Sequence, residues 1–428
     1  MRPTLFLLAA VLYGQSAPDP TVVLDQVRAK IRATMKRIPK YTCLQTVDRS
    51  YYPAEKLKYG ETACAQLSAD GKNAQKPPRP ASTDRLRLEV AQASDSEIHS
   101  WPGSGRFDLK LFDRIVDSGP FGTGAFGGYL IDIFDNDLVQ FDYRGEDVRD
   151  NHRLLVYGYS VARKASHYTV RAHDDWVFTA FSGTFELNPD SVEIERVILQ
   201  TAELPFETGL CEAVSTLDYQ RVEIGDGSFL LPRASQLLLI YQGGGESNSV
   251  TTFEGCREFH AESSVSFGTP TAALEAPDVH RKSRPPLPGG LDVDLRLIDS
   301  IDTDTSAAGD PVSATVVHDV RQSREILIPA GAVVHGRISR MEHHHLPTEY
   351  LVIGLSLQSV EIGGESVPFS ARLQSGPGYV GPGANPSRGL TPRPIGPPNS
   401  FLFSSTTRHV IAAGTMSHWE TTDPATAR

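Results

Sequence analysis

The 428-residue sequence is poor in several features that mark common protein classes. It has only 3 tryptophans and 4 methionines, too few for a recognition surface rich in either residue. Basic residues are also in deficit, because 41 Lys and Arg against 52 Asp and Glu leave a net charge of −11. Nucleic-acid binding without sequence preference needs a basic face for the phosphates. We therefore expect no nucleic-acid partner.

Common catalytic motifs are missing as well. The sequence contains no G-x-S-x-G, no H-E-x-x-H, no Walker loop and no C-x-x-C, each of which places reactive groups at a fixed spacing. Gly122–Gly127 matches G-x-G-x-x-G literally, but it lies in a strand-rich region without the βαβ context of a dinucleotide site. We interpret it as a tight glycine turn. We expect no catalytic residue, no cofactor and no enzyme.

Long apolar runs are also absent, since only the amino terminus has a continuous one, and it is short. Arg2 is followed by the apolar run Leu5–Tyr13 and then by the small residues of Gly14–Ala17. This order is typical of a secretory signal peptide, here residues 1–17, and the run is about half the ~20 residues that span a bilayer. The alternative is an amino-terminal core segment. We expect an exported, soluble mature chain that is periplasmic or associated with the outer membrane.

The few cysteines agree with export. There are four, Cys43, Cys64, Cys211 and Cys256, an even number that predicts two disulfides in an oxidising compartment. Three pairings are open. The local pairing, Cys43–Cys64 and Cys211–Cys256, is favoured because each pair brackets an expected strand-turn-strand segment. Metal binding or a catalytic thiol is the less favoured alternative.

Residues that favour turns are abundant. The 36 glycines and 30 prolines indicate β-structure with many turns. One helix is expected first, because Val23, Val27 and Ile31 recur at helical spacing. Its basic face, with Arg28 and Arg32 among others, is either solvated, which we favour, or in contact with an anionic surface. Alternating runs and short turns then predict a mainly β fold: residues 18–267 form a helix plus a curved antiparallel sheet.

The last third of the chain reads as a separate unit. Residues 268–290 are rich in proline and predict a linker. Residues 291–428 contain further alternating runs and predict a small β-barrel-like domain, with a Gly/Pro-rich insertion at 374–398. We expect the linker to separate two units that fold independently.

One histidine cluster resembles a metal site. His343, His344 and His345 are flanked by Glu342 and Glu349, and zinc needs converging ligands of these types. On a strand only the first and third histidines share a face, and a third ligand is unassigned, although His335 could join from a neighbouring strand. We favour a solvated hairpin tip and expect no metal.

Two partial resemblances follow from particular segments. The helix ending in Ile38–Cys43, the segment Gly122–Phe134 and the run Phe185–Pro189 resemble a family of uncharacterised exported proteins of Gram-negative bacteria. The order of elements over about residues 20–267, a helix followed by a long antiparallel sheet, is also similar to the periplasmic lipoprotein-carrier fold. That resemblance implies a curved sheet around an apolar pocket for acyl chains. The expected disulfides and the glycine loop depart from the carrier pattern.

The second resemblance concerns residues 291–421. Gly309–Ala314 and Ile326–Ile338 resemble the β-barrel domain of the TrbI-type outer-membrane component of conjugation machines. In that family an apolar helical hairpin crosses the outer membrane, whereas residues 374–398 here are rich in glycine and proline. The resemblance implies a cell-envelope β-domain used for binding or assembly, without a pore.

Together these observations predict an exported cell-envelope protein with a non-catalytic binding or scaffolding role. Its expected partner is an apolar ligand in the curved sheet or another envelope protein, with peripheral membrane contact open. The alternative is an exported hydrolase whose active site has no recognisable motif. An apolar tunnel would favour the carrier, a cleft with His and acidic residues the hydrolase, and a filled sheet the scaffold.

Overall fold

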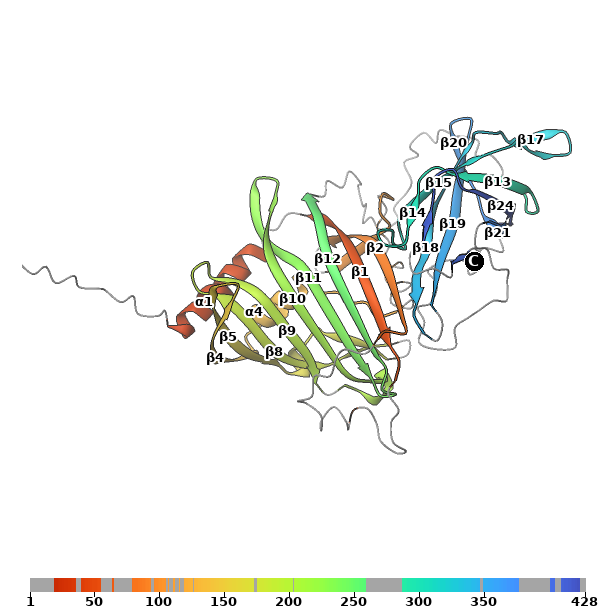
Figure 1. Cartoon of the computed structure of the whole chain (residues 1–428). Coiled ribbons are helices and arrows are strands. Elements are labelled where there is room, and N and C mark those ends of the chain that lie inside the picture. Colours follow the sequence, from red (N-terminus) through yellow and green to blue (C-terminus); the bar gives the residue numbers. More distant parts are fainter. Residues whose placement is uncertain are drawn as a thin grey trace, which may run out of the picture.

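A computed structural model gives the fold of the chain (Figure 1). The described residues are 19–35, 40–54, 64, 79–93, 96–104, 107, 111, 115, 119–125, 127–172, 175–202, 204–258, 287–346, 349–376, 401–404 and 409–423. The expected signal peptide 1–17, nearly all of the linker 268–290 and nearly all of the insertion 374–398 lie outside them. The fold is mainly β, as the sequence predicts.

Two α-helices belong to the described residues of the first half. Helix α1, Pro20–Met35, begins where the Asp19 carboxylate accepts a hydrogen bond from the Thr21 amide at 2.9 Å, with proline in the first helical position. It buries Val23, Val27 and Ile31, the residues whose spacing predicts it. Helix α4, Gly128–Phe134, follows the glycine turn and contacts α1.

Ten antiparallel strands form the sheet of the first half. Their spatial order is β4-β5-β8-β9-β10-β11-β12-β1-β2-β3. The bounds are β1 Tyr41–Tyr52, β2 Ser82–Ala93, β3 Ser96–Ser100, β4 Gln140–Arg149, β5 His152–Val161, β8 Ala180–Asn188, β9 Glu193–Ala202, β10 Leu210–Ile224, β11 Gly227–Tyr241 and β12 Glu246–Glu258. A separate hairpin consists of β6 Thr169–Ala172 and β7 Asp175–Phe178. The sheet is curved, and both helices lie on one side of it (Figure 1).

The chain returns to its beginning inside this sheet, because the first strand β1 pairs with the last strand β12 along its length. This strand pairing brings Cys43 on β1 beside Cys256 on β12. Cys43 is bonded to Cys256, with Cα atoms 4.1 Å apart, and Cys64 to Cys211, at 5.1 Å.

The expected local pairing is therefore wrong. Strand β11 lies between β10, which carries Cys211, and β12, which carries Cys256. Two strands separated by a third are about 10 Å apart, which is too far for a disulfide.

The strands of the second half join the first sheet through the pairing of β18 with β2, and they pack around a core of their own. Its spatial order is β19-β18-β15-β13-β24-β21, with β20 and β22 both pairing with β19. The bounds are β13 Asp292–Leu297, β15 Pro311–Val316, β18 Val333–His344, β19 Tyr350–Ile362, β20 Glu365–Pro368, β21 Ala371–Ser375, β22 Phe401–Ser404 and β24 Met416–Thr421. Two small ribbons pair β14 Ile301–Asp302 with β23 Val410–Ile411 and β16 Val320–Gln322 with β17 Glu325–Ile328. Among the described strands no pairing joins β20 or β22 to β21, so the ladder is open.

The buried side chains fall into two large clusters and a small one. The first cluster runs from Val23 to Phe253 and the second from Leu287 to Trp419. The small third cluster packs Ala308 of the second half against residues of the first half such as Leu86. Separate cores fit the expected division into two units, and independent folding stays a prediction.

Candidate functional site

The concave side of the first sheet is where an apolar ligand was expected. The helices α1 and α4 cover this side, and large side chains pack beneath them. Phe134 and Phe185 are fully buried and meet edge to face, with ring centroids 4.9 Å apart, while Tyr157 stacks on Phe185 at 5.0 Å. Protein side chains thus occupy the space between sheet and helices here.

The basic face of α1 makes ion pairs with neighbouring acidic residues. Arg28 donates to Asp137 at 3.0 Å, Arg32 pairs with Asp135 at 2.7 Å, and Lys30 pairs with Glu193 at 2.8 Å. The three side chains are 22%, 37% and 38% exposed, so the face is partly solvated as expected, and its ion pairs fix the helix to the segment after α4 and to the start of β9.

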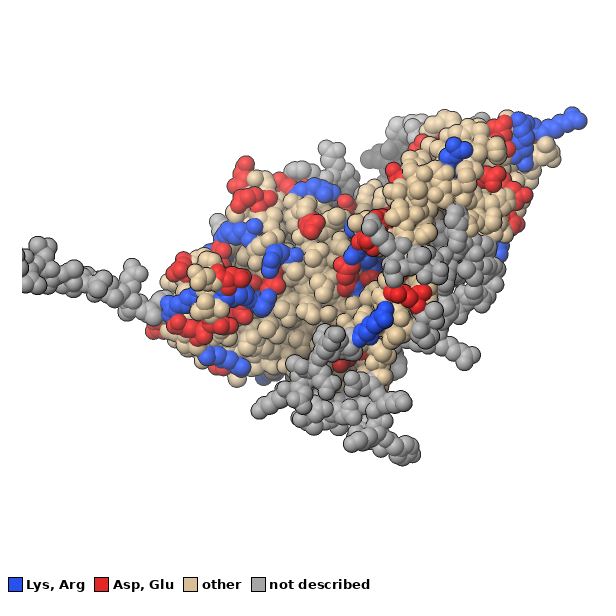
Figure 2. All heavy atoms as spheres, in the orientation of Figure 1, with Lys and Arg blue, Asp and Glu red and all other residues tan. Residues whose placement is uncertain are grey.

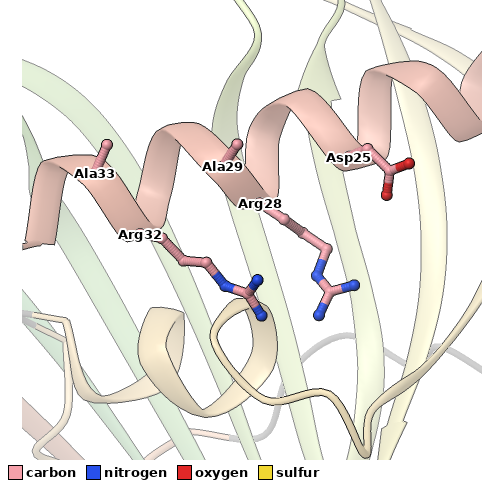
Figure 3. A pocket seen from close by; sticks show the side chains of 5 residues that line it. All are labelled: Asp25, Arg28, Ala29, Arg32 and Ala33. Carbon is pink, nitrogen blue, oxygen red and sulfur yellow. The ribbon is translucent and has the colours of Figure 1, made fainter.

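A shallow groove runs along α1 beside these residues. Figure 3 shows Arg28 and Arg32 projecting from the same side of the helix. The groove has a volume of about 490 Å³. Its lining residues are Asp25, Arg28, Ala29, Arg32 and Ala33. Since both arginines are already paired with aspartates, the groove has no unpaired charge from them to offer a ligand.

A second concavity lies at the seam, the boundary where β2 meets β18 and the loop at residues 303–310. Strand β2 pairs with β3 at its end and with β18 at its beginning, so that Asp84 lies opposite Glu342. The cleft has a volume of about 360 Å³. It is lined by Asp48, Arg49, Ser50, Thr83, Asp84, Arg85, Thr303, Asp304, Met341, Glu342, His343 and Leu351. Acidic and basic side chains gather side by side where the two halves meet (Figure 2).

Buried ion pairs form the floor of this cleft. The guanidinium of Arg49, 2% exposed, binds both oxygens of Asp84, with Nε donating at 2.8 Å. Arg340 donates to both oxygens of Glu342, at 2.6 and 2.8 Å, and His344 contacts the same carboxylate at 2.9 Å. Each buried charge therefore has an opposite charge beside it, which burial requires.

The two carboxyl groups respond differently to burial. Burial raises the pKa of Asp84, and Arg49 opposes that rise only in part. For Glu342, burial alone would raise the pKa, but the hydrogen bonds with His344 and Arg340 outweigh it and hold the pKa below its ordinary value.

Further contacts tie the loop at 303–310 to β2. Arg87 donates to both oxygens of Asp310, at 2.8 and 2.6 Å. The Arg87 amide donates to the Ala308 carbonyl at 2.7 Å, and the Ala308 amide donates back to the Arg85 carbonyl at 2.9 Å. The seam is thus fastened by backbone pairing as well as by charge.

The histidine triplet lies at the end of β18 beside this cleft, and the expected solvated tip is wrong. His344 is 4% exposed and stacks on Tyr350, with ring centroids 4.3 Å apart. His343 and His345 lie on the opposite face, with rings 4.0 Å apart. Burial and the neighbouring His343 lower the pKa of His345. The tip is enclosed because β18 pairs with β19 on one side and with β2 on the other.

His335, considered as a further ligand, belongs to a different group. Ser313, His335 and Glu361 form a row across β15, β18 and β19, with contacts of 3.2 Å from Ser313 to Nδ1 and 3.1 Å from Nε2 to Glu361. The row has the residue types of a hydrolase triad. However, His335 is 44% and Glu361 57% exposed, so water is not excluded as an electrostatically stabilised transition state requires.

Within the described parts of the chain, no helix is long and apolar enough to cross a membrane. No known protein family matches the sequence, and no curated protein matches it.

The solved structures that are similar to the chain include the following two. One is an outer membrane lipoprotein-sorting protein domain from Vibrio parahaemolyticus, 10% identical with a TM-score of 0.26, covering 54% of this chain and 90% of that one. The other is a DUF1329 family protein from Desulfovibrio piger, 11% identical with a TM-score of 0.28, covering 57% and 96%. The first bears the name of the carrier fold that residues 20–267 resemble. At these TM-scores neither likeness carries an argument about function, and the resemblance of residues 291–421 stays a prediction.

Proposed function

We propose that the chain is an exported, non-catalytic cell-envelope protein that acts as a rigid scaffold, with two β units, 18–267 and 291–428, held in a fixed relation by the seam. The observation that carries this proposal is the filled first sheet, where Phe134, Phe185 and Tyr157 occupy the space beneath the helices. A carrier needs room for its ligand, whereas a scaffold needs a packed interior and a fixed surface for an envelope partner.

The seam supports the same proposal. Residues from both halves share the strand pairing between β2 and β18, the ion pair between Arg87 and Asp310, and a small apolar cluster. Interfaces between units of one chain permit motion unless they are large and well packed. The seam would then set the angle at which the second unit presents its strands.

Distances between the units test the proposal. A pair of spin labels at the exposed residues Glu207 and Arg324, introduced through non-canonical amino acids so that the disulfides stay intact, should give one narrow distance distribution. Asp310→Ala, which breaks the ion pair between Arg87 of the first half and Asp310 of the second, should broaden it, and the matched surface variant Glu146→Gln should not. A broad distribution in the wild-type chain would show that the units move independently and that the scaffold proposal is wrong.

Native mass spectrometry of the chain purified from the periplasm separates the two non-catalytic roles. For a scaffold the mass should equal that of the mature chain with two disulfides. A co-purifying lipid of constant mass would favour the carrier, with the aromatic cluster opening to admit it.

A further inference from the structure

We propose that His343, His345 and Glu349 bind one divalent zinc ion at the end of β18, beside the seam cleft. Among the described residues these three form the one group of His, Cys, Asp and Glu whose candidate ligand atoms all lie within 4.8 Å of one another. The proposal goes beyond scaffolding, because a scaffold needs no metal.

The geometry of the three side chains matches zinc. Oε1 of Glu349 lies 3.1 Å from Nε2 of His343 and 3.6 Å from Nδ1 of His345. Zinc bonds to imidazole nitrogen and carboxylate oxygen are about 2.0–2.2 Å long, so two ligand atoms of a tetrahedral site are about 3.3 Å apart. Small side-chain rotations would therefore complete the site around a metal.

The chain brings the ligands together by two simple devices. Alternation along β18 puts His343 and His345 on one face, with the intervening His344 on the other. The antiparallel pairing of β18 with β19 then brings Glu349, one residue before β19 begins at Tyr350, to the two imidazoles.

The surroundings of His345 also favour coordination through Nδ1. Its other nitrogen, Nε2, lies 3.4 Å from the Thr83 hydroxyl on β2. Metal-bound histidines characteristically use their second nitrogen in such a contact, which fixes the orientation of the ring. Because Thr83 belongs to the first half, metal binding at this site would also involve the seam.

Two imidazoles and one carboxylate suit zinc better than calcium or magnesium, which prefer oxygen ligands. Three protein ligands leave one coordination position for water or another group. Arg79, whose Nη2 lies 3.6 Å from the Glu349 carboxylate, is 62% exposed and would turn towards solvent when a cation binds.

The test uses the full chain without a polyhistidine tag, stripped with chelator and dialysed against zinc. One zinc per chain is expected, together with the intense visible absorption of a tetrahedral site when cobalt replaces zinc. The double variant His343→Gln/His345→Gln and the single variant Glu349→Gln should lose the stoichiometric zinc and the cobalt signal. Thr83→Ala should weaken binding by about 10- to 100-fold.

The matched control is His335→Gln. This histidine lies on the same strand and contacts a glutamate at the same 3.1 Å, but it lacks a second imidazole, so zinc stoichiometry should be unchanged. Melting curves in the presence of chelator show that each variant is folded. Absence of stoichiometric zinc in the wild-type chain, or equal binding by folded variants without the ligands, would overturn the proposal.

Discussion

The two cores of the molecule are built from different side chains. The first contains many buried aromatics: Tyr41, Tyr129, Phe134, Tyr157, Tyr159, Phe181, Phe185, Tyr219 and Phe253. In the second, which is mostly aliphatic, Phe369 and Trp419 are the buried aromatics among the described residues. A wide gap between a sheet and helices requires large side chains, whereas strands that curve around a core are filled by valine, leucine and isoleucine.

The largest expected difference in stability between the two cores comes from the disulfides. All four cysteines belong to the first half, and each disulfide closes a long loop, which on the chain-entropy model contributes roughly 2–5 kcal/mol. Reduction of both should lower the stability of the first core by several kcal/mol and leave the second core unchanged. Calorimetry with and without reductant measures this, and equal loss in both cores would show that they unfold as one unit.

The next largest loss of stability is expected from the buried ion pair between Arg49 and Asp84. Arg49→Met removes one partner of a buried ion pair and leaves Asp84 buried and uncompensated, at a cost of about 3–5 kcal/mol. The control Arg153→Met breaks an ion pair at the surface, where Arg153 is 36% and Glu146 is 46% exposed. This variant should lose at most about 1 kcal/mol of stability. Urea unfolding compares the two variants. Similar small losses in both would mean that the buried pair Arg49–Asp84 stabilises the protein no more than an exposed pair does.

Acid should weaken the first half of the molecule through His99 on β3. Burial lowers the pKa of this histidine to about 4 from the ordinary 6.5, so the folded chain keeps it neutral while the unfolded chain takes up a proton. The stability is complete above pH 6.5 and is lost as the pH falls towards 4, by about 3 kcal/mol in total. Unfolding free energies at a series of pH values should show this slope, and His99→Leu should flatten it. An unchanged slope in that variant would assign the acid sensitivity to other groups.

The smallest effect concerns two turns with left-handed backbone. Ser323, in the β16–β17 turn, has φ 56°, and Val192, before β9, has φ 52°, a conformation that costs non-glycine residues about 1–2 kcal/mol. Ser323→Gly should gain about 0.5 kcal/mol after the larger entropy of the unfolded glycine is counted. Val192→Gly should gain less, because Val192 packs against the first core. Chemical denaturation of both variants checks the order, and a larger gain for Val192→Gly would reverse it.

Local features of the fold could be predicted from the sequence. The helix follows from the spacing of Val23, Val27 and Ile31, and the β19–β20 turn from Gly363 and Gly364, both of which have positive φ. The limits of a strand are harder to predict than its presence, as β10, Leu210–Ile224, shows. The earlier part of that strand mixes Glu212, Ser215 and Thr216 with apolar residues, and long-range pairing rather than local pattern makes it extended.

Neighbours across the sheet could not be predicted, because pairing partners are set by tertiary contacts. Cys64 is the cysteine nearest to Cys43 along the chain, but the pairing of β1 with β12 brings Cys43 beside Cys256 in space. Similarly, alternation puts His343 and His345 on one face, but the pairing of β18 with β2 that encloses them has no local signal.

The nesting of the two disulfides has a consequence for biogenesis. If the chain is exported amino terminus first, Cys43 and Cys64 reach the oxidising compartment well before Cys211 and Cys256, and the first pair available to an oxidase is one that the fold does not contain. Thiol–disulfide exchange must then rearrange it, so the yield of native protein should depend on a disulfide isomerase. Periplasmic expression in strains with and without that enzyme, followed by disulfide mapping, would show whether order of emergence limits the protein's production.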